Sequence, residues 1–209
     1  HLIPNAVGQL QRFVERDPTA DDLTELLCSR YFEPDRDWRL FELLVALRLA
    51  RAYAAKSTGK RKSRLLVGSG RSPFGRYVMA DGSEIRLWYQ AWPHDVGVSA
   101  HDDACTHYEI DAGQARPDLV IQRVQNGKTL DALLLELKAS RNGGTLGSGL
   151  LQLLGYLKDR PDLFGIRPGA WLVAPPSNAF VSKDHGGREL WVVDSESVAG
   201  AAVARLSTS

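Results

Sequence analysis

Apolar residues recur at intervals of three and four between residues 38 and 55, the spacing of a helix with one buried face. The residues that set this period are Phe41, Leu44, Val45, Leu49, Ala52 and Tyr53. We therefore predict a core helix over this range. The residues before it are acidic and contain helix-start sequences around Asp17 and Thr19. We interpret residues 1–37 as a small helical lead-in and residues 38–209 as one domain, which is long enough to bury a single substantial core.

Strand patterns dominate the rest of the chain. Segments 76–79 and 84–91 flank Asp81-Gly82, which predicts a hairpin. Further strands are expected at 117–125, 131–139, 169–174 and 189–194. Between the segments 131–139 and 169–174 we predict a helix over about 148–159, entered through the glycine-rich stretch 143–149 and stopped by Pro161. This order predicts an α/β fold, a mixed sheet flanked by helices.

Composition places the chain among ordinary soluble domains. Hydrophobic residues make up 44% and charged residues 24%. The sequence contains no apolar run of membrane-spanning length, and its two cysteines cannot build a disulfide framework. We expect a cytoplasmic protein with no membrane association. Because the chain begins at His1, we also expect a processed or excised fragment with neighbouring domains outside it. The oligomeric state stays open.

Charge is unevenly distributed although the net charge is only +1. Residues 51–76 carry eight basic and no acidic residues, whereas residues 95–111 carry five acidic residues and no lysine or arginine. Such segregation creates local fields that a net charge conceals. The basic segment suggests phosphate contacts from Lys60, Arg61, Lys62 and Arg64. A solvated basic loop explains the same residues equally well.

Two predicted strands carry the candidate chemistry, Asp118 on one and Glu136 and Lys138 on the next. Side chains alternate along a strand, so Glu136 and Lys138 share a face. A strict two-residue turn at Asn126-Gly127 would pair Gln125 with Lys128 and place Asp118 on the opposite face. A three-residue loop or a β-bulge would restore the shared face. We therefore predict one of these two irregularities.

Two converging carboxylates form a hard oxygen site that suits Mg²⁺, with Mn²⁺ as a substitute, completed by water and a phosphate oxygen. Such a metal would polarise a phosphate and activate a bound water. Lys138 would position or deprotonate that water and offset negative charge. The structural alternative makes Glu136 and Lys138 an exposed charge pair, Asp118 a turn residue after Pro117, and Glu42 a surface residue.

The motifs Pro117-Asp118, Glu136-Leu137-Lys138 and Gln152-x-x-x-Tyr156 resemble the PD-(D/E)xK nuclease superfamily, in the branch that includes RecB-like and McrC-like nucleases. The resemblance spans about residues 38–175 and implies a restriction-endonuclease-like fold and a Mg²⁺-dependent deoxyribonuclease. It also implies a role in restriction, repair or anti-phage defence beside a motor or sensor domain.

The resemblance further implies the residue roles. Asp118 and Glu136 would bind metal, Lys138 would be catalytic, and Glu42 on the early helix would support the metal. Gln152 and Tyr156 would face the DNA or the site, away from a leucine stripe formed by Leu150, Leu153, Leu154 and Leu157. Glu42 has independent support, because it falls within the apolar arc of its helix, where an unpaired carboxylate is costly.

The rival function is a non-catalytic nucleic-acid-binding or assembly module with the same fold. Other clusters carry less. His101, Asp102, Asp103, Cys105 and His107 lack zinc-site spacing and are interpreted as a solvated acidic loop. No nucleophile-elbow sequence surrounds a serine such as Ser140 that could form a triad with His185 and Asp194. The glycines around Ser69 lack the following Lys-Ser/Thr of a phosphate loop.

Overall fold

The computed structural model describes residues 37–59, 62–63, 72–96, 99–111, 115–160, 163–166, 168–176 and 190–207. The predicted lead-in therefore lies outside the described residues except for Asp37, and so do Lys60, Arg61 and Arg64. Lys62 is described in its backbone only. The expected phosphate contacts of this basic segment stay a prediction.

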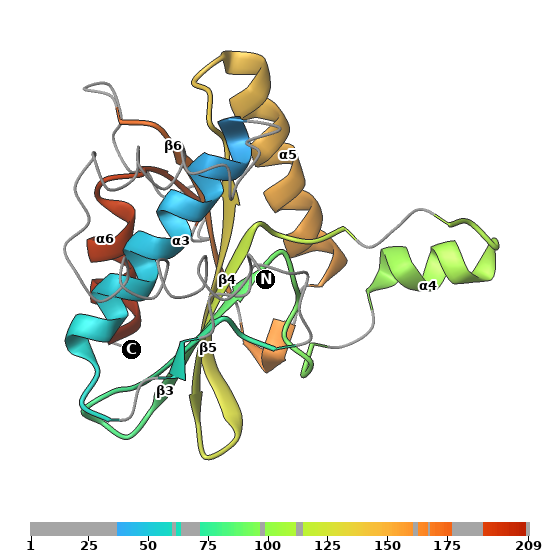
Figure 1. Cartoon of the computed structure of the whole chain (residues 1–209). Coiled ribbons are helices and arrows are strands. Elements are labelled where there is room, and N and C mark those ends of the chain that lie inside the picture. The colour runs from blue at the N-terminus through green and yellow to red at the C-terminus, as the bar shows by residue number, and fades with distance from the viewer. Residues whose placement is uncertain are drawn as a thin grey trace, which may run out of the picture.

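The described chain forms an α/β fold around a mixed sheet of seven strands that lie in sequence order (Figure 1). The first five strands form an antiparallel meander, and the last two run parallel to the fifth. The strands are β1 (Lys62–Ser63), β2 (Gly75–Val78), β3 (Glu84–Tyr89), β4 (Leu119–Gln125), β5 (Lys128–Leu137), β6 (Gly169–Ala174) and β7 (Leu190–Asp194). The predicted strands are confirmed within a few residues at their ends.

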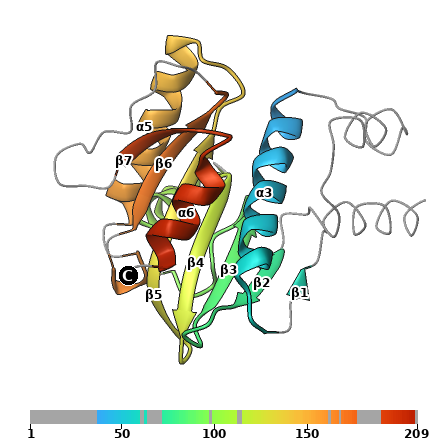
Figure 2. The same ribbon diagram turned by 90° about the vertical axis from the view of Figure 1, so that its left-hand side faces the viewer.

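Helices cover both faces of the sheet (Figure 2). The helices α3 (Asp37–Lys56) and α6 (Val198–Ser207) pack on one face, and α5 (Gly143–Asp159) packs on the other. A 3-10 turn, η1 (Leu163–Gly165), lies on the α5 side. The predicted core helix corresponds to α3, whose Val45, Leu49 and Tyr53 are fully buried. Among the described residues, no helix has the length and apolarity to cross a membrane.

The predicted start of α5 is wrong by five residues. The glycine-rich stretch expected to be a loop is the first part of the helix, which begins at Gly143. The Asn142 side chain accepts a hydrogen bond from the Gly144 amide and its carbonyl accepts one from Leu146. This N-cap offsets the poor helix propensity of the glycines by satisfying amides that otherwise lack partners.

The acidic loop predicted around residues 101–107 is also wrong, because α4 (Ala100–His107) is a helix. The Ser99 hydroxyl caps it by accepting from the Asp102 amide, and acidic residues in its first turn favour the helix dipole. None of its residues is buried, and it projects from the body on the α5 side (Figure 1). Residues 100–107 contain too few apolar side chains to show a helical period, so the sequence did not predict α4.

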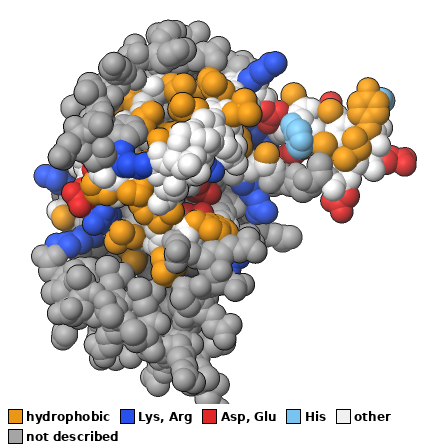
Figure 3. Space-filling model, turned by 90° about the horizontal axis from the view of Figure 1, so that it is seen from above, with side chains coloured by type: hydrophobic (Ala, Val, Ile, Leu, Met, Phe, Trp, Pro, Cys, Tyr) orange, Lys and Arg blue, Asp and Glu red, His pale blue; other side chains and the backbone are white. Residues whose placement is uncertain are grey.

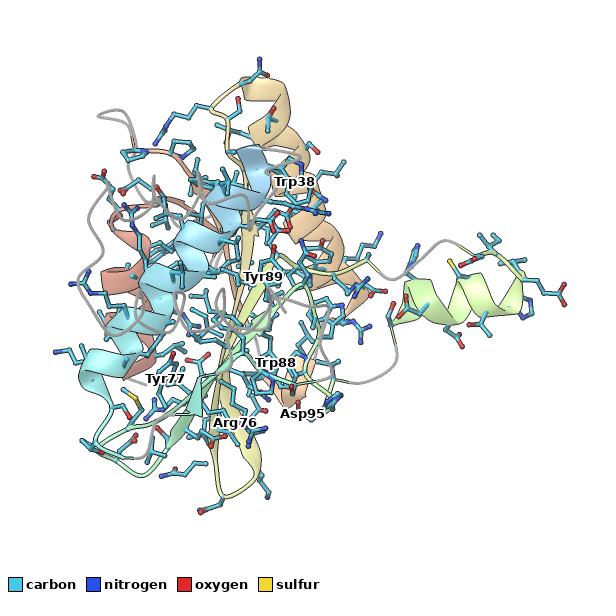
Figure 4. The ribbon with its side chains drawn as sticks, in the orientation of Figure 1. Trp38, Arg76, Tyr77, Trp88, Tyr89 and Asp95 are labelled. Carbon is cyan, nitrogen blue, oxygen red and sulfur yellow. The ribbon has the colours of Figure 1, made fainter. Side chains whose placement is uncertain are left out.

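A buried polar cluster secures the segment that leaves β3. Gln122 is fully buried, accepts a hydrogen bond from Trp88 Nε1, and donates through Nε2 to Asp95 and Thr129. Figure 4 shows Trp88 and Asp95 below Tyr89, toward the β4–β5 turn. With each polar atom of the Gln122 amide satisfied, the cluster fixes the path of residues 90–96.

Candidate active site

A β-bulge determines which side chains share a face in the central hairpin. The turn has two residues, Asn126 and Gly127, with φ of 51° and 77°, the left-handed values that match the strand twist. Gln125 pairs with Lys128, yet farther along the ladder Arg123 pairs with Asp131 rather than with Leu130. The bulge alternative of the predicted irregularity is therefore confirmed, and the longer turn is not.

The shifted register brings the two motif carboxylates opposite each other. Leu119 pairs with Leu135, so the next step of the ladder sets Asp118 across from Glu136. On the other side of the sheet, Leu133, Leu135 and Leu137 pack against α3 and α6. Without the bulge, Asp118 would point into that core instead of toward Glu136.

Asp118, Glu136 and Lys138 lie together where β4 begins and β5 ends. Asp118 Oδ2 accepts from the Leu137 amide at 2.7 Å. Lys138 Nζ donates to Glu136 Oε1 at 2.8 Å and to Gln152 Oε1 at 2.7 Å. The Lys138 amide donates to Val173 of β6, which fixes its backbone. The interpretation of Glu136 and Lys138 as an exposed pair fails, because the Glu136 side chain is only 3% exposed.

Glu42 reaches the same end of the sheet from α3. Its Oε2 accepts from the Tyr89 hydroxyl at 2.7 Å and from Gln90 Nε2 at 3.0 Å, and the residue is 3% exposed. The Gln90 amide donates to the Asp118 carbonyl at 2.8 Å. The interpretation of Glu42 as a surface residue is therefore wrong, and these bonds connect it to Asp118 through Gln90.

Burial raises the pKa of all three carboxylates, and repulsion from neighbouring carboxylates adds to the rise for Glu42 and Glu136. Burial raises the pKa of Glu42 to about 7, and the nearby Asp118 adds to the rise against the bonds from Tyr89 and Gln90. Burial, with the charge of Asp118, also raises the pKa of Glu136 to about 7, although Lys138 opposes it. Burial raises the pKa of Asp118, while the Leu137 amide and Lys138 act against the rise. Lys138 therefore offsets only part of the cost of burying Asp118 and Glu136 as carboxylates.

The donor set fits a hard divalent cation. Glu136 Oε2 is buried and has no hydrogen-bond partner, which is costly unless something else pairs with it. A cation between Asp118 and Glu136 would supply that partner and relieve the repulsion. Within the described ranges, no group of three or more His, Cys, Asp or Glu residues is arranged to hold a metal ion. Direct metal ligation by Glu42 therefore stays a prediction, and most of the coordination shell would be water and substrate oxygen.

Two residues of α5 border the site. Gln152 is exposed and bonds Lys138, while Tyr156 is buried and donates its hydroxyl to the Arg116 carbonyl at 2.7 Å. Tyr156 also packs edge-on against Trp92. Tyr156 is buried in the same cluster as Leu153, so the prediction that it faces away from the leucine stripe is wrong. Leu154 of that stripe is 39% exposed. A 100° helical step carries that position beyond the contact with the sheet.

Sequence reasoning missed Gly149, Tyr89 and Gln90. Gly149 is buried where α5 crosses the Lys138 stem, and a Cβ there would lie 2.6 Å from Leu172 Cδ1 and 2.9 Å from Lys138 Cε. The glycine lets the helix approach closely enough for Gln152 to bond Lys138. The only signal in the sequence is that it lies three residues before Gln152. The other glycines in the same stretch hide that signal. Tyr89 and Gln90 gave no signal, because their partner Glu42 is 47 and 48 positions away.

The serine-triad alternative gains no support, because Asp194 accepts bonds from Glu196 and Ser197 at the start of α6 and His185 lies outside the described residues.

Comparison with known proteins adds no relative: no family model, no curated protein and no solved structure matches the chain. The function must therefore be argued from the site itself.

Proposed function

We propose that the chain is a metal-dependent nuclease that hydrolyses DNA phosphodiester bonds with a PD-(D/E)xK-type site on a restriction-endonuclease-like fold. The observation that carries the proposal is the bulge-dependent register that sets Asp118 opposite Glu136, with Lys138 bonded to the second carboxylate. A structural charge pair would not require a buried carboxylate oxygen without a partner. Mg²⁺ bound here would polarise the scissile phosphate and lower the pKa of a water.

The protein groups have separate roles in this proposal. Asp118 and Glu136 hold their carboxylates in fixed positions, because the Leu137 amide and the Lys138 ammonium orient them. Lys138 is held between Glu136 and Gln152, and its charge would offset the negative charge that develops on the phosphate oxygens. Glu42 would orient the Asp118 segment through Gln90.

The test separates chemistry from folding. Lys138→Ala should keep Mg²⁺ or Mn²⁺ binding and melting temperature close to those of the parent, yet reduce cleavage by at least about a hundredfold, the lower range for a positioned acid-base group. Asp118→Ala should lose both metal binding and cleavage. Titration calorimetry, a cleavage assay and thermal melting of each variant give the three readouts. Robust cleavage by a well-folded Lys138→Ala variant would refute the role given to this lysine.

The second candidate is a non-catalytic nucleic-acid-binding or assembly module. The basic segment that includes Lys60 and Arg61 favours it, since phosphate binding requires no carboxylate site. DNA binding by the parent with no cleavage under Mg²⁺ or Mn²⁺ would support this candidate instead. A motor or sensor domain beside the chain is equally compatible with either function.

A further inference from the structure

Arg116 lies in the segment that leads into β4, two residues before Asp118. The residue is exposed, and its Nη1 donates to the Gln90 carbonyl at 3.2 Å. Within the described residues, this guanidinium makes no bond to a carboxylate. An arginine beside an acidic site therefore has only a neutral carbonyl as its partner in this part of the chain.

Two other cations at this end of the sheet act on the carboxylates themselves. Lys138 donates to Glu136 at 2.8 Å. Burial raises the pKa of Glu42, and Arg39, about one helical turn before it, acts against the rise. Arg116 differs from both, because a guanidinium carries several N–H donors and the bond to a carbonyl uses few of them. Its remaining donors and its charge are available to an anionic ligand.

Two hydrogen bonds hold the backbone at this arginine. The Tyr156 hydroxyl donates to the Arg116 carbonyl at 2.7 Å, and Trp92 Nε1 donates to the Ala115 carbonyl at 2.9 Å. The Tyr156 and Trp92 rings pack edge to face, so the two donors support each other. A cation on a segment that is already fixed loses less conformational freedom when it binds a ligand.

Gln90 connects this arginine to the carboxylate site. Its φ is 44°, in the left-handed region that residues other than glycine seldom adopt. Its amide donates to the Asp118 carbonyl at 2.8 Å, and its own carbonyl accepts the bond from Arg116. One residue in a strained conformation thus fixes both the arginine and the start of β4, and such strain is common at binding sites.

The ligand that fits these features is a phosphodiester. Each DNA phosphate brings a negative charge toward buried carboxylates, so a neighbouring cation would offset the repulsion. The forked donors of an arginine match the geometry of phosphate oxygens. Seen from above, acidic atoms lie near the middle of the described surface and basic side chains lie on either side of them (Figure 3).

We propose that Arg116 binds a DNA phosphate beside the carboxylate site, and that Tyr156 is a positioning residue that holds the Arg116 carbonyl. The proposal rests on the proposed nuclease function for its substrate, DNA. It gives Tyr156 a role through Arg116 in place of a direct contact with DNA.

The test measures DNA binding rather than cleavage, with the full chain in an Asp118→Asn background at constant Mg²⁺ and with single-stranded and duplex oligonucleotides as probes. Arg116→Ala should weaken binding roughly tenfold to a hundredfold, the range of a hydrogen bond to a charged group. It should also lower the salt dependence of binding by about one unit. Lys128→Ala, at the opposite end of the β4–β5 hairpin, removes the same charge from an exposed position and should change neither quantity.

A double-mutant cycle tests the positioning role. Tyr156→Phe removes only the hydroxyl, and we expect it to weaken DNA binding roughly twofold to tenfold, the range of a neutral hydrogen bond. The same change should have no further effect in Arg116→Ala, because the residue that it positions is then absent. A merely structural role would instead give the same loss in both backgrounds, with melting temperature as the control for folding.

The two proposals fail in different ways. Arg116→Ala that matches its background in DNA affinity and in salt dependence would overturn this inference, even if the parent cleaves DNA. Additive effects of the two substitutions would overturn the role given to Tyr156. A parent that binds DNA through Arg116 but cleaves none would refute the nuclease function and support the phosphate contact.

Discussion

The close approach of α5 to Lys138 depends on Gly149, and adding one methyl group tests it. In Gly149→Ala the new Cβ would lie 2.6 Å from Leu172 Cδ1 and 2.9 Å from Lys138 Cε. Leu172 is fully buried in β6, so it cannot move away freely. Overpacking of this kind costs about 1–3 kcal/mol. The helix or the Lys138 stem must shift, and either shift disturbs the bonds to Glu136 and Gln152.

A matched control separates packing from helix propensity. Gly155 lies in the same helix with nothing within 4 Å of an added Cβ. Gly155→Ala should stabilise the protein by about 1 kcal/mol, the ordinary gain of alanine over glycine. Because both variants gain that propensity, the difference between them measures the overpacking cost alone. It should appear as a melting temperature lower by roughly 2–12 °C in Gly149→Ala.

Activity gives the second readout of the same pair of variants. Cleavage should fall in Gly149→Ala by more than its unfolded fraction explains and stay at the parent level in Gly155→Ala. Equal stability and equal cleavage of the two variants would refute the argument that α5 positions Lys138 through Gly149.

Three further predictions concern charge. In chelator, stability should fall as the pH rises from about 4.5 to about 7, because the folded state holds the Glu42 proton more tightly than the unfolded chain does. Glu42 should account for about 3 kcal/mol of this loss in the free energy of unfolding. Chemical denaturation at a series of pH values should show a shallower dependence of stability on pH in Glu42→Gln. An unchanged dependence would contradict the raised pKa of Glu42. Saturating Mg²⁺ should reduce the same slope, since a bound cation favours the ionised carboxylates, and calorimetry in two buffers should detect proton release. The last prediction concerns the basic segment Lys60, Arg61, Lys62 and Arg64. Neutralising these residues should lower the salt dependence of DNA binding by about one unit for each lost phosphate contact. An unchanged salt slope would identify them as a solvated loop.

Local pattern was sufficient to predict six of the seven strands, all except β1. The strands of the β2–β3 and β4–β5 hairpins alternate apolar and polar residues or form apolar runs bounded by turn residues, so they could be located before any tertiary contact was known. An irregularity in the β4–β5 hairpin, either a bulge or a longer turn, was predictable for a different reason. Asp118 and Glu136 cannot share a face across a two-residue turn unless the ladder contains one extra residue, and Leu130 is that residue.

The parts that sequence reasoning missed depend on contacts between distant residues. Gly143 has the propensity of a loop residue, but the Asn142 cap stabilises the helix that begins at this glycine. The need for a glycine at position 149 comes from the close contact of α5 with Lys138 and Leu172. The hydrogen bonds from Tyr89 and Gln90 to Glu42 join residues more than forty positions apart. Periodicity reflects only the local structure of one segment, so a single sequence does not predict such contacts.

We propose that opposed carboxylates at the start of β4 and near the end of β5 make this chain a nuclease, and DNA cleavage tests this most directly. The measurement compares the parent with Asp118→Asn, purified in parallel, on linear and circular DNA with Mg²⁺, Mn²⁺ or chelator. The account predicts cleavage by the parent that requires a divalent metal, and loss of cleavage in Asp118→Asn with its melting temperature retained. Cleavage that persists in Asp118→Asn, or that the parent fails to perform under every one of these conditions, would contradict it.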